Sequence, residues 1–263
     1  MDIGITGWPL DRTLSPVIHA ELFRLSGIEG HYREYPAESS GLAVLLSRLH
    51  GEGLKGLNVT YPHKTDAMRY CSGLDEEAQA VSAVNTLTSV GEGWVGYNTD
   101  VAGFRHALSC FNAPDPVCVI GSGGAARAAA KALTEEARDF SIFCRSPETW
   151  SGEGRVYSLE DLEECMKISS GTLVNTTVLG WQDDDDFPIY WNIPGGFLFM
   201  DMNYNPDWLW RNSRKARGMR VVTGEHMLVR QAAESFRIWT GFEVDEESLA
   251  DITRKLLSRE EQT

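Results

Sequence analysis

The chain has 263 residues, of which 42% are hydrophobic, and a formal net charge of −14. This length suffices for two modest domains or one large one, and the composition is that of an ordinary globular protein. The acidic charge argues against nucleic acid or an anionic membrane as partner, and no apolar run is long enough to span a bilayer. The N-terminus lacks the segments of a secretory signal, and the five scattered cysteines form no C-x-x-C pair. We therefore expect a cytoplasmic protein without a disulfide framework or a zinc ribbon.

The N-terminal segment predicts a strand over residues 2–7, a turn-rich loop and then a helix that ends near Gly27. Ser15 is expected to cap this helix, with Pro16 at its first position. Taken alone, Ser15 is most simply a helix cap and Thr13 a loop hydroxyl. Both residues also place hydroxyl groups at a helix N-terminus, where an anion is favoured.

Three polar residues in the following part of the chain are candidate site residues because of their positions relative to the predicted strands and helices. Lys64 follows the predicted strand 56–60, where an α/β protein meets ligands, although most lysines lie on the surface. Asn85 is unusual inside a predicted strand and either turns toward a site or lies on an exposed edge. Asp100 is most simply the cap of the helix 101–108. Further strands are predicted at residues 31–35, 83–88 and 94–97, and helices at 42–50, 64–70 and 75–81.

A glycine motif follows the turn-rich joint at residues 112–116 and stands between an apolar strand and an Ala-rich helix. The stretch Gly121-Ser122-Gly123-Gly124-Ala125-Ala126 fits the dinucleotide-binding pattern G-x-G-x-x-G/A. Gly121 allows a tight turn, Gly123 lets a pyrophosphate approach the backbone, and Ala126 lets the helix lie close to the sheet. The N–H groups and positive dipole end of the helix then face the phosphates. The pattern favours dinucleotide binding over an ordinary turn.

The end of the next predicted strand, residues 140–143, indicates which dinucleotide is bound. An NAD site usually carries an acidic residue there, but Asp139 lies at the opposite end of this strand. Arg145 is placed to meet a 2′-phosphate and to stack on adenine, which favours NADP; the alternative is a solvated surface arginine. Further strands are predicted at 171–174, 197–202 and 219–222, and helices at 159–166, around Trp208, at 227–240 and at 248–258. This alternation predicts an α/β fold with mainly parallel sheets.

Several motifs, spread over nearly the whole chain, together resemble the shikimate dehydrogenase family, which includes the quinate/shikimate dehydrogenases. The most specific are Asn58-Val59-Thr60-x-Pro62-His63-Lys64 and Gly96-x-Asn98-Thr99-Asp100-x-x-Gly103. The others are Gly7-x-Pro9…Thr13-x-Ser15-Pro16…His19, Ala83-Val84-Asn85-Thr86, the glycine motif, Asn175-Thr176-Thr177 and Met227-Leu228-Val229-x-Gln231-Ala232. The resemblance replaces the simpler interpretations of Lys64, Asn85 and Asp100 with functional ones.

The resemblance implies two α/β domains with a cleft between them. The expected substrate domain comprises residues 1–100 plus 238–263, and the expected Rossmann-like NADP-binding domain, with a parallel sheet, comprises 101–237. The implied activity is reversible NADPH-dependent reduction of 3-dehydroshikimate to shikimate, in the pathway to chorismate and the aromatic amino acids. The expected partners are NADP(H) and this substrate, and the expected state is a monomer or homodimer. No metal, nucleic acid or membrane is expected.

Carried over residue by residue, the resemblance makes Lys64 and Asp100 the catalytic pair. Alcohol oxidation releases a proton, and which member of this coupled pair carries it stays open. Lys64 also adds positive charge where an alkoxide-like oxygen develops. The implied substrate-binding residues are Thr13 and Ser15 for the carboxylate, Asn58, Thr60, Asn85 and Gln231 for the ring hydroxyls, and Tyr204 near substrate and nicotinamide. The implied cofactor-binding residues are Gly121, Ser122, Gly123, Gly124, Ala125, Cys144, Arg145, Ser146, Thr176 and Gly224.

The chain departs from the family pattern at a few positions. Family members often have Ser at Thr13, Asn at Cys144 and Gly at His226, and the Ala83 position is commonly Gly. The extra methyl group of Thr13 is expected to narrow the carboxylate pocket or to alter the choice between shikimate and quinate. The His226 side chain lies close to the expected nicotinamide site, where it would crowd the ring or alter cofactor preference. The alternatives are therefore a quinate/shikimate or aminoshikimate-type dehydrogenase using NAD(P), or a non-catalytic dinucleotide sensor on the same fold.

Overall fold

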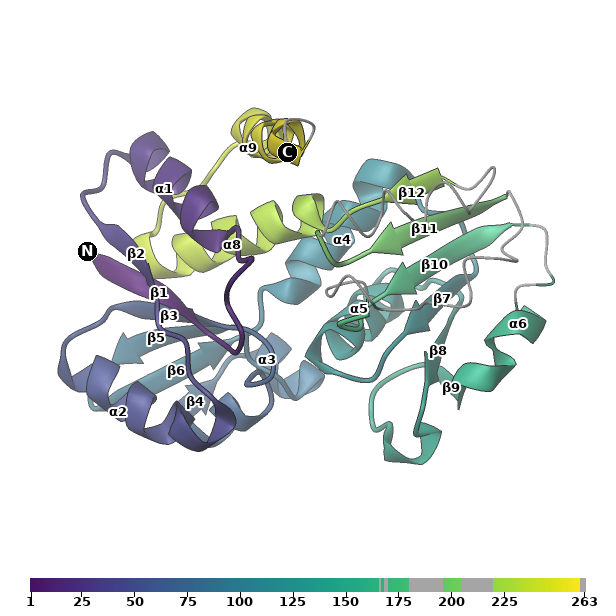
Figure 1. Ribbon diagram of the computed structural model, residues 1–263, viewed down its shortest axis with the longest axis horizontal. Helices are drawn as coiled ribbons and strands as arrows, with labels where there is room; N and C mark the ends of the chain where they lie inside the picture. The colour runs from purple at the N-terminus through teal and green to yellow at the C-terminus, as the bar shows by residue number, and fades with distance from the viewer. Residues whose placement is uncertain (166, 168–169, 180–195, 205–219, 261–263) are drawn as a thin grey trace. The chain divides into compact units, whose positions relative to one another are not determined.

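The computed structural model describes residues 1–165, 167, 170–179, 196–204 and 220–260 (Figure 1). The chain divides into two compact units. Unit 1 comprises Met1–Gly103 and Leu228–Leu256, and unit 2 comprises Phe104–Met227 and Leu257–Thr263. None of the helices in the described ranges has both the length and the apolar character needed to cross a bilayer.

Unit 1 is built on a mixed sheet of six strands in the order β2-β1-β3-β5-β6-β4. β1 pairs in parallel with β2 and β3, whereas β5 is antiparallel to β3 and to β6. The strands are β1 Asp2–Thr6, β2 His31–Glu34, β3 Gly56–Val59, β4 Cys71–Leu74, β5 Thr86–Val90 and β6 Gly93–Tyr97. The helices are α1 Ser15–Ser26, α2 Leu42–Gly51, α3 Glu76–Val81, most of α8 Glu225–Thr240 and most of α9 Glu246–Glu260; α4 Asp100–Phe111 begins here.

Two apolar cores hold unit 1 together. α2 places Leu42, Leu45, Leu46 and Leu49 at helical spacing against strand residues such as Leu57. The second core joins β1 to α1, α8 and α9, which lie together in Figure 1. Its buried members are Ile3, Ile18, Leu22, Phe23, Val229, Ala232, Ala233, Phe236, Leu249, Ile252 and Leu256.

This second core explains where the chain returns to unit 1. The sequence placed the return at residue 238, whereas the structure places it at Leu228. Val229 and Phe236 of α8 are buried against β1 and α1, so nearly the whole helix belongs to unit 1. The first boundary lies at Gly103, three residues beyond the expected Asp100.

Unit 2 is a sheet of six strands in the order β12-β11-β10-β7-β8-β9, and its neighbouring strands pair in parallel. When β7–β12 are numbered 1–6, the order read from the β9 edge is 3-2-1-4-5-6, which is the doubly wound Rossmann order. The strands are β7 Val117–Ile120, β8 Phe140–Cys144, β9 Arg155–Ser158, β10 Gly171–Asn175, β11 Phe197–Asp201 and β12 Arg220–Val222; the helices include α5 Gly124–Glu135 and α6 Leu162–Cys165. The order reverses between β7 and β10, and ligands of such sheets bind outside the strand ends there. The predicted α/β fold with a Rossmann-like parallel sheet is confirmed.

Some local expectations differ from the structure. Ser15 is the first residue of α1 and makes no cap hydrogen bond, because Leu14 occupies the N-cap position. Asn85 lies in a bend before β5, not inside a strand. The edge strands β4 and β9 were not predicted, and residues 64–70 contain only the 3₁₀ turn Asp66–Tyr70 in place of a helix. The helix expected around Trp208 lies outside the described residues.

Candidate active site

Lys64 and Asp100 form a close ion pair in unit 1. Lys64 follows β3 and Asp100 opens α4, and Lys64 Nζ lies 2.6 Å from Asp100 Oδ2. The side chains are 20% and 5% exposed, respectively, so water screens the pair only weakly. The carboxylate is enclosed, and the Lys64 side chain is the more exposed member of the pair.

The start of α4 leaves the Asp100 side chain available for this pair. Asn98 Oδ1 accepts a hydrogen bond of 3.1 Å from the Asp100 backbone N–H, and Asn98 Nδ2 donates to the Ala83 carbonyl at 2.9 Å. The side-chain bond to an N–H at this helix start thus comes from Asn98. The simple interpretation of Asp100 as a helix cap therefore does not describe its side-chain contacts.

Asn85 holds the other oxygen of Asp100. Its Nδ2 donates to Asp100 Oδ1 at 2.8 Å and to Thr99 Oγ1 at 2.9 Å, and its Oδ1 accepts from the Thr99 backbone N–H at 2.8 Å. The bend before β5 is anchored on both sides, since Val59 N–H donates to the Asn85 carbonyl and Asn85 N–H donates to the Tyr97 carbonyl. Asn85 is 2% exposed, so this amide fixes the carboxylate from inside the protein.

Asn58 links β3 to β2, β5 and α8 by side-chain hydrogen bonds. It lies in β3 and is 5% exposed. Its Oδ1 accepts from the Tyr32 hydroxyl at 2.8 Å, and its Nδ2 donates to Ser235 Oγ at 3.0 Å and to Thr86 Oγ1 at 3.1 Å. The ring of His19 stacks on Tyr32 at 4.1 Å, and burial lowers the pKa of His19 to about 3. Neutral groups therefore surround Asn58.

Gln231 connects α8 to the same network. Its Oε1 accepts from Asn85 Nδ2 at 3.3 Å, and its Nε2 donates to the Leu228 carbonyl at 2.8 Å. Ser235, one turn later, donates to the Gln231 carbonyl at 3.0 Å. Sequence reasoning missed Ser235 and Tyr32; the spacing of Ser235 from Gln231, which puts both on one helix face, was the available signal.

The remaining predicted substrate residues of unit 1 lie at element ends. Thr13 Oγ1 accepts from the Ser15 backbone N–H at 3.3 Å just before α1, and Thr60 follows β3. Ser15 is 5% exposed, while Thr13 and Thr60 are half-buried. Among the described contacts, no side chain of these three bonds to Lys64 or Asp100. The structure thus joins Lys64, Asp100, Asn85, Asn58 and Gln231 in one hydrogen-bonded network. Thr13, Ser15 and Thr60 lie at the ends of α1 and β3 and are not bonded to Lys64 or Asp100 in the described contacts.

The glycine motif of unit 2 has the geometry that a dinucleotide requires. Gly121 has a φ of +125°, and a Cβ there would lie 2.5 Å from Thr176 Oγ1, so the turn itself demands glycine. Gly123 precedes α5, is exposed, and has open space where a Cβ would point. Protein packing gives no reason for glycine at this position, but the close approach of a phosphate does. Ala126 is fully buried, as the close helix packing predicts.

The other predicted cofactor residues of unit 2 follow its strands. Cys144 ends β8 and is 4% exposed, while Arg145 immediately after it is exposed. Asp139, at the opposite end of β8, pairs with Arg155. The Gly224 N–H donates to the Asn203 carbonyl at 3.3 Å. Ser122 is exposed, and Gly124, Ala125, Ser146 and Thr176 are half-buried. Tyr204, the predicted substrate-binding residue in unit 2, is also half-buried.

Two carboxyl groups that the sequence did not single out are buried in unit 2. Asp201 ends β11 and Glu225 opens α8, and both are 0% exposed. Asp201 Oδ1 accepts from Asn175 Nδ2 and from the Asn203 backbone N–H, each at 3.0 Å. Burial raises the pKa of Asp201 from 3.8 to about 8, and the charge of Glu225 acts in the same direction. Asp201 is therefore largely protonated at neutral pH.

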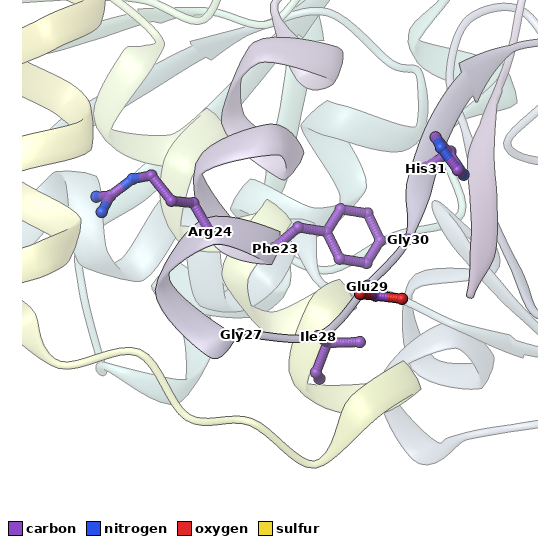
Figure 2. A pocket seen from close by; sticks show the side chains of 7 residues that line it. All are labelled: Phe23, Arg24, Gly27, Ile28, Glu29, Gly30 and His31. Atoms are coloured by element: carbon purple, nitrogen blue, oxygen red, sulfur yellow. The ribbon is translucent and has the colours of Figure 1, made fainter.

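A surface pocket of about 510 Å³ lies apart from these groups, at the turn between α1 and β2 (Figure 2). It is lined by Phe23, Arg24, Gly27, Ile28, Glu29, Gly30 and His31. None of these residues belongs to the Lys64–Asp100 network, so we do not assign the pocket to the candidate active site.

Comparison with known proteins identifies relatives over the full length of the chain. Residues 5–87 match the shikimate dehydrogenase substrate binding domain, and residues 224–250 match the shikimate 5′-dehydrogenase C-terminal domain. A shikimate dehydrogenase (NADP(+)) of Bacillus licheniformis is 32% identical over 268 residues, which cover 97% of this chain and 96% of that protein.

Solved structures give the same result. The shikimate 5-dehydrogenase of Thermus thermophilus, in complex with NADP(H) and shikimate, has a TM-score of 0.82 at 31% identity and covers 97% of this chain and 99% of its own. Shikimate dehydrogenase 1 of Peptoclostridium difficile has a TM-score of 0.85 at 27% identity, with 98% of each chain covered.

Proposed function

The chain belongs to the shikimate dehydrogenase family, and we propose that it interconverts shikimate and 3-dehydroshikimate with NADP(H), using Lys64 and Asp100 as its catalytic pair. It is an NADP-dependent oxidoreductase. The observation that carries the assignment of the pair is the contact of 2.6 Å between Lys64 Nζ and Asp100 Oδ2, with the Lys64 side chain the more exposed member and the carboxylate enclosed.

The proposed mechanism asks little of the protein beyond proton handling and orientation. NADP(H), when bound, supplies the hydride chemistry. Oxidation of the alcohol releases a proton, and the pair accepts it; in the reverse direction the pair returns it to the carbonyl oxygen. Asp100 directs Lys64 through their contact of 2.6 Å, and the charge of Lys64 stabilises the negative oxygen that develops. Because the two groups are coupled, the proton belongs to the pair.

We assign the substrate-binding roles to unit 1. Thr13 and Ser15 offer hydroxyl groups at the N-terminus of α1, where a carboxylate is favoured. Thr60, Asn58, Asn85 and Gln231 are proposed to bind ring hydroxyls. The amide atoms of Asn58, Asn85 and Gln231 also bond to protein groups, and we propose that these three residues hold the network around Asp100 as well.

We assign NADP binding to unit 2, at the carboxyl ends of β7 and β8. The glycine motif with the N-terminus of α5 would hold the pyrophosphate, and Arg145 would hold the 2′-phosphate. The side chain of Cys144 is buried, which leaves Arg145 as the charged group of this loop. Ser146, Thr176 and Gly224 complete the proposed set. The proposal includes a cytoplasmic setting and a monomeric or homodimeric enzyme, and light scattering distinguishes these two states.

Arg145→Ala is expected to weaken NADP⁺ binding at least about tenfold while NAD⁺ binding changes little, because a charge-assisted contact to a phosphate is worth about 1.5–3 kcal/mol. The dissociation constants of both cofactors, measured by fluorescence titration, check this. Arg155→Ala is the matched control, since Arg155 is also exposed but begins β9, at the opposite end of the sheet from Arg145. An equal loss for both cofactors in Arg145→Ala would show that Arg145 does not read the 2′-phosphate.

The function is tested by initial rates in a grid of shikimate or quinate against NADP⁺ or NAD⁺. Activity dominated by shikimate with NADP⁺ is the expected result. Dominance of quinate or NAD⁺ would move the chain to the quinate-type alternative and implicate Thr13 or His226. Absence of activity in all four combinations, with NADP⁺ still bound, would contradict the proposal and favour another polyol acid or a sensor.

A further inference from the structure

Two imidazoles and a thiol lie together in unit 2. His106 and Cys110 are four residues apart on α4 and therefore share a helix face. His226 is the second residue of α8. One potential ligand atom from each of the three residues lies within 4.8 Å of the others, and Cys110 Sγ is 3.4 Å from a ring nitrogen of His106.

This spacing is close to that of a tetrahedral metal centre. Zn²⁺ binds cysteine sulfur at about 2.3 Å and histidine nitrogen at about 2.0–2.1 Å, so two such ligands stand about 3.5 Å apart. Cys110 and His106 already have nearly this separation. A movement of about 1 Å by the His226 ring would bring the third ligand into the same geometry.

The surroundings allow an ion to enter and to be held. Cys110 is exposed and both histidines are half-buried, so the ligand atoms are accessible from solution. The ring of Phe111 packs edge-on against His226 at 4.7 Å, which restricts the orientation of this imidazole.

We propose that His106, Cys110 and His226 form a binding site for a divalent transition metal ion of the Zn²⁺ class, with a fourth position left for water. Thiolate and imidazole ligands select such ions over Mg²⁺ or Ca²⁺, which take oxygen ligands. Metal binding is measured without substrate or NADP(H), so its test does not depend on the proposed function. The competing explanation is a simple thiol–imidazole hydrogen bond between Cys110 and His106.

The test is a Zn²⁺ titration of the full chain, stripped with a chelator and kept reduced, in competition with a chromophoric chelator. The wild type should bind one Zn²⁺ tightly. The Zn²⁺ affinity should fall at least about tenfold in each of His106→Ala, Cys110→Ser and His226→Ala. Loss of a residue that only hydrogen-bonds to a metal ligand already costs about this much, so loss of a ligand itself should cost no less. His31→Ala and Cys71→Ser are the matched controls, because both residues lie in unit 1, and they should leave the affinity unchanged.

A second readout uses Co²⁺ in place of Zn²⁺. A thiolate-to-cobalt absorption band should appear in the wild type and in both controls and should be absent in Cys110→Ser. Thermal unfolding of each variant shows that the fold is kept. Failure of the wild type to bind Zn²⁺, or wild-type affinity in any one of the three ligand variants, would overturn the three-residue site.

Discussion

Lys64→Ala is expected to lower kcat for shikimate and NADP⁺ at least about a hundredfold, the range that general acid–base groups contribute. The substitution removes the more exposed member of the proposed pair and leaves the Asp100 carboxylate, whose side chain is 5% exposed, without its cation. Steady-state rates give the effect on kcat. Binding of NADP⁺ should be kept, since the residues proposed to hold it belong to unit 2.

The matched control for this change is Lys55→Ala. Lys55 is an exposed lysine just before β3, the strand that Lys64 follows, and its removal should leave kcat unchanged. Lys64→Arg keeps the positive charge next to Asp100, but a guanidinium does not release its proton, so this variant should also turn over slowly. Near-normal turnover in Lys64→Ala, with the fold and NADP⁺ binding intact, would rule out the assigned role.

Asp201→Asn is expected to stabilise the protein at alkaline pH, and the gain should grow as the pH rises. The pKa of Asp201 is raised from 3.8 to about 8, so between these values the folded state binds more protons than the unfolded state. The contribution of Asp201 to stability is therefore fully present below about pH 4 and is lost as the pH rises through about 8. The shift sets an upper limit of about 6 kcal/mol on this loss.

Asparagine resembles the protonated form of this side chain. It keeps an oxygen for the bonds from Asn175 and Asn203, and it places an amide where Asp201 Oδ2 has no hydrogen-bond partner among the described residues. Urea unfolding between pH 5 and 9 measures the effect. Asp139→Asn is the control, because Asp139 is 61% exposed and its pairing with Arg155 should contribute at most about 1 kcal/mol. An Asp201→Asn gain that is the same at pH 5 and pH 9 would show that ionisation is not its cause.

The sequence predicted best what depends on neighbouring residues. The apolar run of β7, Gly121 with its positive φ and the Ala-rich α5 lie within one short stretch, so the turn was recognisable and a role in phosphate binding could be predicted from it. The short edge strands β4 and β9 were missed because their sequences have no clear alternation of apolar and polar residues.

The contacts of the candidate site come from far apart in the chain. Lys64 and Asp100 are 36 residues apart, and only the motifs of the family resemblance connected them. Asn58 and Ser235 are 177 residues apart, and nothing local marks Ser235 as a partner. Asp201 is the polar residue that ends the apolar strand β11, and nothing in the local sequence indicates that its carboxyl group is buried. The apolar stripe of a helix such as α8 indicates that this face packs against a core, but it does not indicate which of the two sheets the core belongs to.

The discontinuous course of unit 1 bears on the order in which the two units can be completed during synthesis. Residues 104–227 of unit 2 leave the ribosome as one continuous stretch. Unit 1 begins first, yet its second core needs Val229 and Phe236 of α8 and Leu249 of α9 to cover β1 and α1. The apolar faces of β1 and α1 therefore stay uncovered until α8 and α9 have been synthesised. Unit 2 can mature early, whereas the network around Asp100 is complete only when α8 delivers Gln231 and Ser235.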